Sequence, residues 1–157
     1  MWTDERGSEL LPFGDCARLL ATAAKKGLTG RLGISTPQAP VVQPVNFAYV
    51  DHRIMVRLGP GHLVDLMSGA VVAFEVDHVD TDSRQAWSVL VRGPAALLSD
   101  DERRAFAKGA PKPLVPRPGD MIFTVSLDVV TGRRFPLDTI SPGSGVEARP
   151  PSMAANG

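Results

Sequence analysis

Cysteine and histidine are scarce in this chain, which has one cysteine, Cys16, and three histidines, His52, His62 and His78. A lone cysteine excludes a disulfide within the chain and a thiolate metal cluster, and it favours a reducing, cytoplasmic environment. None of the histidines stands at the spacing that is typical of zinc ligands. We therefore expect no metal site.

The sequence also lacks an excess of charge and a long apolar run. Its 17 Lys and Arg side chains are balanced by 17 Asp and Glu side chains, so no net charge attracts nucleic acid or an anionic membrane. No segment approaches the roughly 20 apolar residues of a membrane-spanning helix, and the N-terminus has no signal-peptide pattern. We expect neither nucleic acid nor a membrane as a partner.

Several sequence motifs of catalytic and nucleotide-binding sites are missing. The chain has no Walker A loop, no GxGxxG and no GxSxG, which argues against a P-loop site, a dinucleotide-binding Rossmann site and a nucleophile elbow. Cys16 lies on a predicted amphipathic helix, where a small packed side chain is the favoured interpretation. The catalytic residues therefore stay unknown at this level.

Length and composition indicate one globular domain. The 157 residues, of which 43% are hydrophobic and 22% charged, suffice for a single core. We assign residues 1–140 to this domain. Residues 141–157 are rich in Ser, Pro, Gly and Ala and predict a flexible C-terminal tail.

Residues 41–66 form the most informative stretch of the chain. Apolar residues alternate at period two in 41–50 and again in 53–58, which predicts two strands with one buried face each. Asp51-His52 predicts the turn between them, and Gly59-Pro60-Gly61 predicts a bend that opens a short helix. The residues expected to face the core are Val45, Phe47, Tyr49, Ile54, Val56 and Leu58 in the strands and Leu63, Leu66 and Met67 in the helix.

The remaining segments predict further strands and two more helices. A helix over 16–26 follows Asp15, which can cap it, and Ser99 with Glu102 has capping-box spacing before a helix that ends near Lys108. Further strands are predicted over 31–36, 71–77, 87–98 and 121–128, with a bend at Gly93-Pro94 and a turn at Thr131-Gly132. About six strands and three helices favour a mainly β (α+β) fold, a small antiparallel barrel with flanking helices.

The bend at 59–61 is a candidate anion site, because a helix N-terminus follows it. Arg57 at the end of the preceding strand and His62 in the first helical turn are suited to donate to a phosphate there. A plain strand-to-helix turn is the alternative, and spacing alone does not separate the two.

Three other features each have two interpretations. Trp87 shares a strand face with Val89 and Val91, which favours a place in the core over stacking on a flat cofactor. The pair Arg133-Arg134 is more typical of a solvated sheet edge than of a binding site. The acidic residues around His78 favour a charged loop that protects a sheet edge over a cation site; they are Asp77, Asp80 and Asp82.

Six segments occur in an order that resembles a known family. They are GRLGIS (30–35), PVNFAYVD (44–51), RIMVRLGPG (53–61), VVAFEVD (71–77), WSVLVRGPA (87–95) and VTGRRF (130–135). From about Leu10 to Phe135 the chain resembles pyridoxamine 5′-phosphate oxidase-like, FMN-binding split-barrel proteins, in particular the actinobacterial group with nitroimidazole-reductase-type members. The resemblance implies a split antiparallel β-barrel, a homodimer, and FMN (in some branches a deazaflavin or heme) in a groove at the subunit interface.

The resemblance also implies which residues hold the cofactor. The strand that lines the flavin ring is matched by Pro44, Val45, Asn46 and Phe47, and the strand that flanks the ring by Trp87 and Ser88. The strand end and bend that receive the phosphate are matched by Arg57, Leu58, Gly59 and Gly61, followed by His62 and Leu63. Arg133 and Arg134 match a Gly-Arg-Arg placed to reach the cofactor or the partner subunit.

The chain departs from this family at the phosphate cradle. Family members commonly have a Thr or Ser directly after the Arg and a Thr-Lys pair after the bend, whereas this chain has Leu58 and His62-Leu63. Each such contact to a charged group is worth roughly 1.5–3 kcal/mol. Their loss predicts weaker FMN binding, unless Arg57 and His62 compensate or the ligand differs.

Three functions follow as hypotheses. The first is an FMN-dependent oxidoreductase or reductase that acts on a small molecule, with the cofactor carrying the hydride or the electrons. The second is a protein that binds a flavin, a deazaflavin or heme without turnover, for storage or sensing. The third is a structural or interaction domain with an empty groove.

Overall fold

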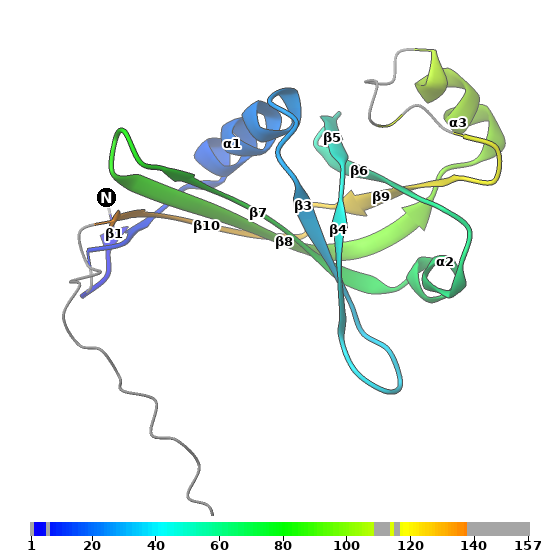
Figure 1. Cartoon of the computed structure of the whole chain (residues 1–157), viewed down its shortest axis with the longest axis horizontal. Coiled ribbons are helices and arrows are strands. Elements are labelled where there is room, and N and C mark those ends of the chain that lie inside the picture. Colours follow the sequence, from blue (N-terminus) through cyan, green and yellow to red (C-terminus); the bar gives the residue numbers. More distant parts are fainter. Residues whose placement is uncertain (1, 6, 109–113, 115–116, 138–157) are drawn as a thin grey trace, which may run out of the picture.

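The computed structural model describes residues 2–5, 7–108, 114 and 117–137 of the chain. The predicted tail, 141–157, lies outside these residues, as do the last three residues of the predicted domain. Within the described residues, antiparallel strands form a curled half-barrel that three α-helices flank (Figure 1). The mainly β (α+β) fold with flanking helices is therefore confirmed.

The strands form one sheet that divides into two sets. The main set has the order β1-β2-β10-β8-β7-β3-β4, and the set β5-β6-β9 joins it through β8. The strands are β1 (Trp2–Thr3), β2 (Glu9–Leu10), β3 (Gly30–Ile34), β4 (Val41–Val45), β5 (Phe47–Val50), β6 (Arg53–Leu58), β7 (Val71–Asp80), β8 (Gln85–Leu97), β9 (Met121–Ser126) and β10 (Val129–Pro136). The helices are α1 (Phe13–Lys25), α2 (His62–Met67) and α3 (Asp100–Ala107).

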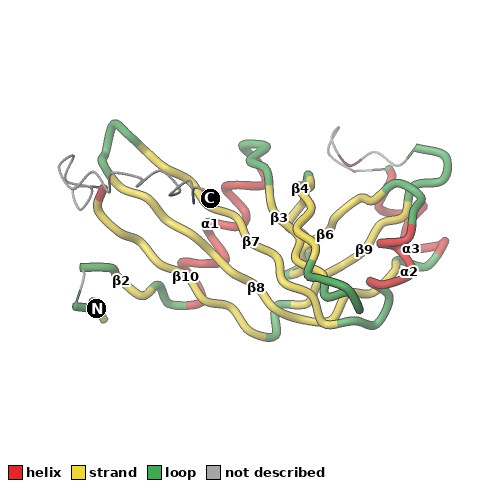
Figure 2. Tube along the Cα trace, turned by 60° about the horizontal axis from the view of Figure 1, so that its bottom comes forward, coloured by secondary structure: helices red, strands yellow, loops and turns green. Residues whose placement is uncertain are grey.

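The helices lie at two different places on the half-barrel. α1 packs against β5, β8 and β10, whereas α2 and α3 both lie towards the end of the molecule that is on the right in Figures 1 and 2. None of the helices in the described residues is long and apolar enough to cross a membrane. The position of α1 beside β5 is the feature that creates the candidate site.

The predicted strand over 41–50 is divided in two at Asn46. β4 pairs with β3 in the main set, and β5 pairs with β6 in the second set, so the chain changes sets at this residue. The prediction of one continuous strand is wrong, because strands that pass a corner between two sheets bend or break there. Val45 and Phe47 nevertheless face the core, as expected, at 6% and 5% exposure.

β8 connects the two sets and bends where Gly93-Pro94 was predicted to bend. Its first part pairs with β7 and β10, and Ala95–Leu97 pair with β9. A Cβ on Gly93 would overlap the carbonyl oxygen of Ser126. Glycine is therefore required by the close approach of a second strand at the bend.

Three local predictions are wrong. β7 runs on to Asp80, so the acidic stretch around His78 is strand and not loop. α1 begins after Pro12, and Asp15 lies in its first turn without capping it. β10 continues through Thr131-Gly132 without a turn, and a Cβ on Gly132 would lie 2.5 Å from Cys16 Sγ. Glycine at position 132 thus allows α1 to pack closely against β10. In the sequence alone, the Thr131-Gly132 pair is typical of a turn.

The turn at Asp51-His52 and the capping box at Ser99 are confirmed. Asp51 and His52 have positive φ angles of 50° and 57°, as a two-residue hairpin turn requires, although neither is glycine. The Ser99 hydroxyl accepts the Glu102 N–H, and the Glu102 carboxylate accepts the Ser99 N–H.

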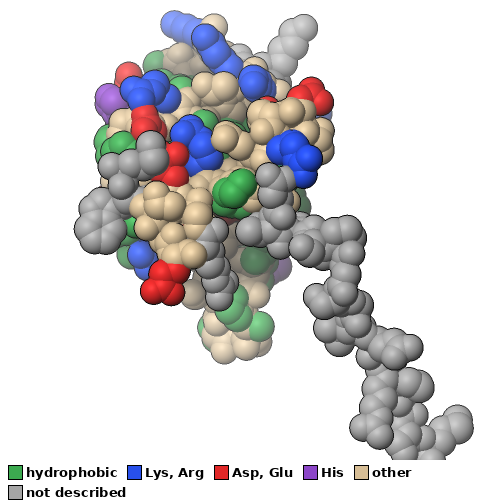
Figure 3. Space-filling model, turned by 90° about the vertical axis from the view of Figure 1, so that its left-hand side faces the viewer, with side chains coloured by type: hydrophobic (Ala, Val, Ile, Leu, Met, Phe, Trp, Pro, Cys, Tyr) green, Lys and Arg blue, Asp and Glu red, His purple; other side chains and the backbone are tan. Residues whose placement is uncertain are grey.

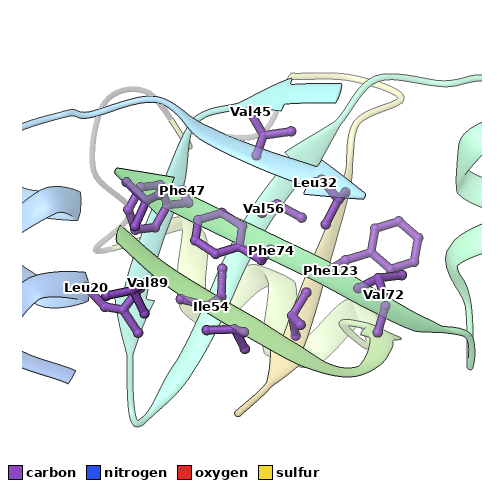
Figure 4. Packing of buried hydrophobic residues seen from close by; sticks show 14 of the residues in the cluster. Leu20, Leu32, Val45, Phe47, Ile54, Val56, Val72, Phe74, Val89 and Phe123 are labelled. Carbon is purple, nitrogen blue, oxygen red and sulfur yellow. The ribbon is translucent and has the colours of Figure 1, made fainter. Parts of the chain in front are cut away.

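The core fills the inner face of the half-barrel (Figure 4). Phe47 from β5 and Phe74 from β7 meet edge to face with ring centroids 4.8 Å apart. The opposite face of β5 and β6 is also covered, because Ala48 and Met55 pack against Leu114 in a second cluster. The expectation of one buried face for β6 was thus incomplete, since Met55 is only 4% exposed.

Candidate ligand-binding site

A hollow of about 700 Å³ lies between α1 and β5. Its walls are formed by Arg18, Ala21, Thr22, Ala24, Lys25, Gly27 and Leu28 from α1 and the residues after it, and by Asn46, Phe47, Ala48, Tyr49 and Val50 from β5 and the residue before it. This volume is within the usual range of about 300–1,000 Å³ for small-molecule sites.

Small side chains on one face of α1 leave the space for this hollow. Ala21 and Ala24 of α1 and Gly27 just after it line the hollow, while Leu20 on the neighbouring face of α1 is fully buried in the core. The start of the helix is fixed by the Leu11 N–H, which donates to the Gly132 carbonyl at 2.9 Å. Because Ala21, Ala24 and Gly27 are small, they leave space between α1 and β5 that larger side chains would fill.

β5 contributes one of its backbone edges to the hollow. In the part of the chain that the structure describes, β6 is the sole strand that pairs with β5. An edge strand presents N–H and C=O groups that can bind another partner. A flat heterocycle with its own donors and acceptors can hydrogen-bond to such an edge, as a further strand would.

The hollow combines an apolar lining with basic side chains. Phe47, Ala48 and Val50 are apolar, and Arg18 and Lys25 are the cationic lining residues. Arg18 is also paired with Asp15 in the first turn of α1. This arrangement suits a ligand with a flat apolar body and an anionic or carbonyl-rich part.

Tyr49, which lines the hollow, forms a hydrogen-bonded pair with His52. The Tyr49 hydroxyl lies 3.2 Å from His52 Nδ1, across the turn that joins β5 to β6. Burial raises the pKa of Tyr49, so the phenol remains protonated at neutral pH. Sequence analysis placed His52 in the turn, where the structure leaves it exposed, but did not pair it with Tyr49, because the contact depends on the positive φ angles of the turn.

Among the predicted ring-contacting residues, the structure brings Asn46 and Phe47 to the hollow. Val45 is buried in the core, and Pro44 is exposed in β4. Phe47 pairs with Val56 in β6, the residue directly before Arg57. The predicted ring strand and the predicted phosphate rim are therefore neighbours.

The predicted phosphate rim contains an acidic residue that sequence analysis missed. Arg57 Nε lies 3.5 Å from Asp120 Oδ2, and the two side chains are 21% and 12% exposed. Asp120 directly precedes β9, whose Ile122 pairs with Arg57. In the sequence, the one sign of Asp120 was a charged residue directly before an apolar strand. Its partner Arg57 is 63 positions away (57 to 120), and the two residues meet only when the sheet forms.

The other rim residues differ in exposure. Leu58 is buried at 8% exposure, whereas Gly59, Gly61 and His62 are exposed and Leu63 is half-buried. Gly61 precedes α2 with an extended φ of 161°. The bend followed by a short helix is thus confirmed as local structure, and its binding role stays a prediction.

The remaining predicted residues form a separate group. Arg133 pairs with Ser88, and Arg134 with Trp87, in the ladder between β10 and β8. The two guanidinium groups bind the N-terminal segment, Arg133 to Asp4 at 2.8 Å and Arg134 to Glu9 at 3.4 Å. This part of β8 lies by the β7–β8 turn, at the end of the molecule opposite α2 (Figure 1).

Trp87 and its neighbours follow the predicted packing in part. Val89 and Val91 are fully buried, while Trp87 is half-buried against the core, with its ring centroid 6.3 Å from that of His78.

On the side that Figure 3 shows, Lys and Arg side chains are interspersed with Asp and Glu. Among the described residues, no group of three or more His, Cys, Asp or Glu could hold a metal ion.

A curled antiparallel half-barrel with a hollow beside an edge strand is the architecture of the split-barrel proteins. A profile of the pyridoxamine 5′-phosphate oxidase family matches residues 14–134, most of the chain. The chain therefore belongs to this family, as its six ordered segments predicted.

Similar proteins occur in mycobacteria and corynebacteria. The uncharacterized protein Rv0080 of Mycobacterium tuberculosis is 31% identical over 134 residues, which cover 82% of this chain and 86% of the relative. The solved structure of a FAD-binding protein from Mycobacterium smegmatis is 30% identical with a TM-score of 0.67, covering 81% of this chain and 98% of the other. A conserved protein of unknown function from Corynebacterium diphtheriae is 27% identical with a TM-score of 0.64, covering 82% and 98%.

Proposed function

We propose that this protein is a flavin-dependent oxidoreductase that acts on a small molecule, with the flavin ring in the hollow between α1 and β5. The observation that carries the proposal is the free backbone edge of β5 on an apolar hollow of about 700 Å³. The similar M. smegmatis protein is described as FAD-binding. FMN, which the resemblance implied, carries the same ring.

The lining residues suit a flavin ring in three ways. The ring face is apolar and matches Ala21, Ala24 and Leu28 on the helix side of the hollow. Its pyrimidine edge carries carbonyl and N–H groups that complement the backbone edge of β5. The cations of Arg18 and Lys25 stabilise negative charge that develops on a reduced ring. A bound flavin supplies hydride or single-electron chemistry that side chains lack.

The Tyr49–His52 pair favours turnover over storage. A substrate that gains a hydride also needs a proton, and the Tyr49 hydroxyl is a donor on the wall of the hollow. After Tyr49 gives up its proton, His52 delivers a replacement from solvent through Nδ1. The pair therefore supports the oxidoreductase over the storage alternative.

A homodimer belongs to the same proposal. Val42, Gly33, Ala73, Arg92 and Val129 form one row across five neighbouring strands. Val42 and Val71 on this outer face are 66% and 69% exposed, and Val129 is 45% exposed. Exposed valines in register across a sheet suit burial against a second copy.

Spectroscopy of the purified protein tests the flavin proposal. We expect protein mixed with riboflavin, FMN or FAD to quench the flavin fluorescence and retain the ligand after gel filtration. The loaded protein should then consume NAD(P)H with nitro or quinone acceptors. A bound flavin without any turnover would support the storage alternative, and heme or deazaflavin uptake alone would contradict the flavin assignment.

A second test locates the ring. Ala24→Trp fills the hollow from α1 with a bulky side chain and should abolish flavin binding while the far-UV circular dichroism stays unchanged. Ala17→Trp, on the same helix but outside the lining residues, is the matched control. Equal flavin affinity in both variants would place the ring elsewhere.

A further inference from the structure

Asp120 is buried at the rim that the family resemblance assigns to the cofactor phosphate. The residue is 8% exposed, and its Oδ2 lies 3.5 Å from Arg57 Nε. The same oxygen accepts the backbone N–H of Arg117 at 2.8 Å, which fixes the carboxylate in the turn before β9. Arg57 thus has an anionic partner from its own chain.

The turn that carries Asp120 packs directly against the 59–61 bend. A Cβ on Gly59 would lie 3.9 Å from Asp120 Oδ1. A Cβ on Gly119 would lie 3.9 Å from Pro60 Cγ. The carboxylate therefore faces both Arg57 and the bend, the two parts of the predicted phosphate cradle.

A carboxylate at this place changes which anions the rim accepts. The Arg57–Asp120 pair has no net charge, and the carboxylate repels a second anion in proportion to that anion's charge. A phosphate monoester carries about −1.5 to −2 charges near neutral pH. Riboflavin carries no phosphate and is not repelled.

Positions 58–63, at the strand end and the bend, hold no Lys or Arg that would offset this repulsion. Leu58 and Leu63 stand where family members commonly have a hydroxyl and an ammonium group. His62 is exposed after the bend and is a weaker phosphate partner than a lysine. The terminal phosphate of FMN thus meets a carboxylate without the usual compensating donors.

We propose that Asp120 determines the flavin specificity of this protein: its ion pair with Arg57 makes the rim disfavour the terminal phosphate of FMN, so that FMN gains little over riboflavin. The inference rests on the proposed flavin binding and deepens it by naming the residue that sets the preference among flavins. Asp120 acts through Arg57 and through its own charge, so it is a specificity-determining residue and takes no part in the redox step.

Equilibrium binding of riboflavin, FMN and FAD to the full chain tests the proposal. In the wild type we expect FMN to bind within about threefold of riboflavin, since the phosphate adds little. Asp120→Asn keeps an acceptor for the Arg117 N–H and removes the charge. It should raise FMN affinity at least tenfold and leave riboflavin affinity unchanged.

Asp101→Asn is the matched control, because it removes the same charge from an exposed side chain of α3. It should leave all three affinities unchanged. A wild type that binds FMN more than thirtyfold more tightly than riboflavin overturns the proposal even if Asp120→Asn does not fold. Unchanged FMN affinity in a folded Asp120→Asn variant overturns it as well.

Failure of the flavin proposal has a different signature. Riboflavin carries the ring without a phosphate, so its binding reports on the ring site alone. If riboflavin, FMN and FAD all fail to bind, both proposals fall. If riboflavin binds and FMN is strongly preferred, flavin binding stands and the role of Asp120 falls.

Discussion

Gly93 of β8 lies so close to Ser126 of β9 that a Cβ at Gly93 would overlap the Ser126 carbonyl oxygen. This contact is where the long strand passes from one strand set to the other, and the half-barrel closes around it. The backbone of Ser126 cannot move away without breaking its pairing with Arg53.

Gly93→Ala should therefore destabilise the protein. Overpacking at a site without room typically costs about 1–3 kcal/mol, and contact with a backbone carbonyl places this change at the upper end. Urea unfolding measures the effect. Gly33→Ala in β3 is the control, because its Cβ would meet the Ala73 Cβ at an acceptable 3.4 Å. Equal losses in both variants would show that the Gly93 contact is unimportant.

Ser99→Ala should weaken α3. The Ser99 hydroxyl accepts the Glu102 N–H at 3.2 Å, and loss of an N-cap acceptor costs about 1 kcal/mol. Chemical denaturation followed by circular dichroism measures this loss. Ser35→Ala, at an exposed residue just after β3, should change stability by less than half as much.

Glu102 should contribute to stability in a pH-dependent way. The backbone N–H and hydroxyl of Ser99 lower the pKa of Glu102, so its carboxylate form favours the folded state. This contribution is present above the ordinary glutamate pKa and disappears as the pH falls through the lowered value. Glu102→Gln should be less stable than the wild type at neutral pH, and the difference should vanish in acid. A difference that persists in acid would contradict this account.

Tyr49→Phe should separate turnover from cofactor binding. The variant keeps the aromatic ring on the hollow and loses the proton donor, whose removal typically costs about 10²–10⁴ in rate. We expect kcat with a nitro or quinone acceptor to fall about a hundredfold while flavin affinity stays within twofold. A fall in affinity with kcat preserved would assign Tyr49 to binding alone.

His52→Gln distinguishes a proton relay from a packing role. It removes the imidazole from the Tyr49 hydroxyl and leaves the phenol on the hollow. If His52 returns the proton, kcat should fall by about tenfold with KM unchanged, a smaller loss than in Tyr49→Phe. An unchanged kcat would restrict the catalytic role to Tyr49.

Val71→Lys should dissociate the proposed dimer. Val71 is 69% exposed on the outer face of β7, two residues from the Ala73 row, and a buried unpaired ammonium opposes association. Sedimentation velocity should show a monomer. Val79→Lys, near the other end of β7 and 55% exposed, is the control and should stay dimeric. A wild type that sediments as a monomer would contradict the proposal directly.

Local sequence patterns determined much of this protein. Alternation over 53–58 predicted β6, because every second side chain of a half-buried strand must leave water. Spacing of Ser99 and Glu102 predicted the start of α3, because a helix N-terminus needs those acceptors within one turn. The order of six segments predicted the family, and with it the curled antiparallel fold.

Only the tertiary structure decided where the chain changes sheets and what surrounds the predicted site. Asn46 divides one alternating run into two strands, since alternation records burial and not the partner of a strand. The carboxylate of Asp120 meets Arg57 only after β6 and β9 pair, and Tyr49 meets His52 only through a turn with positive φ angles. No local sequence pattern relates the residues in these contacts, because the distance between them is set only when the chain folds.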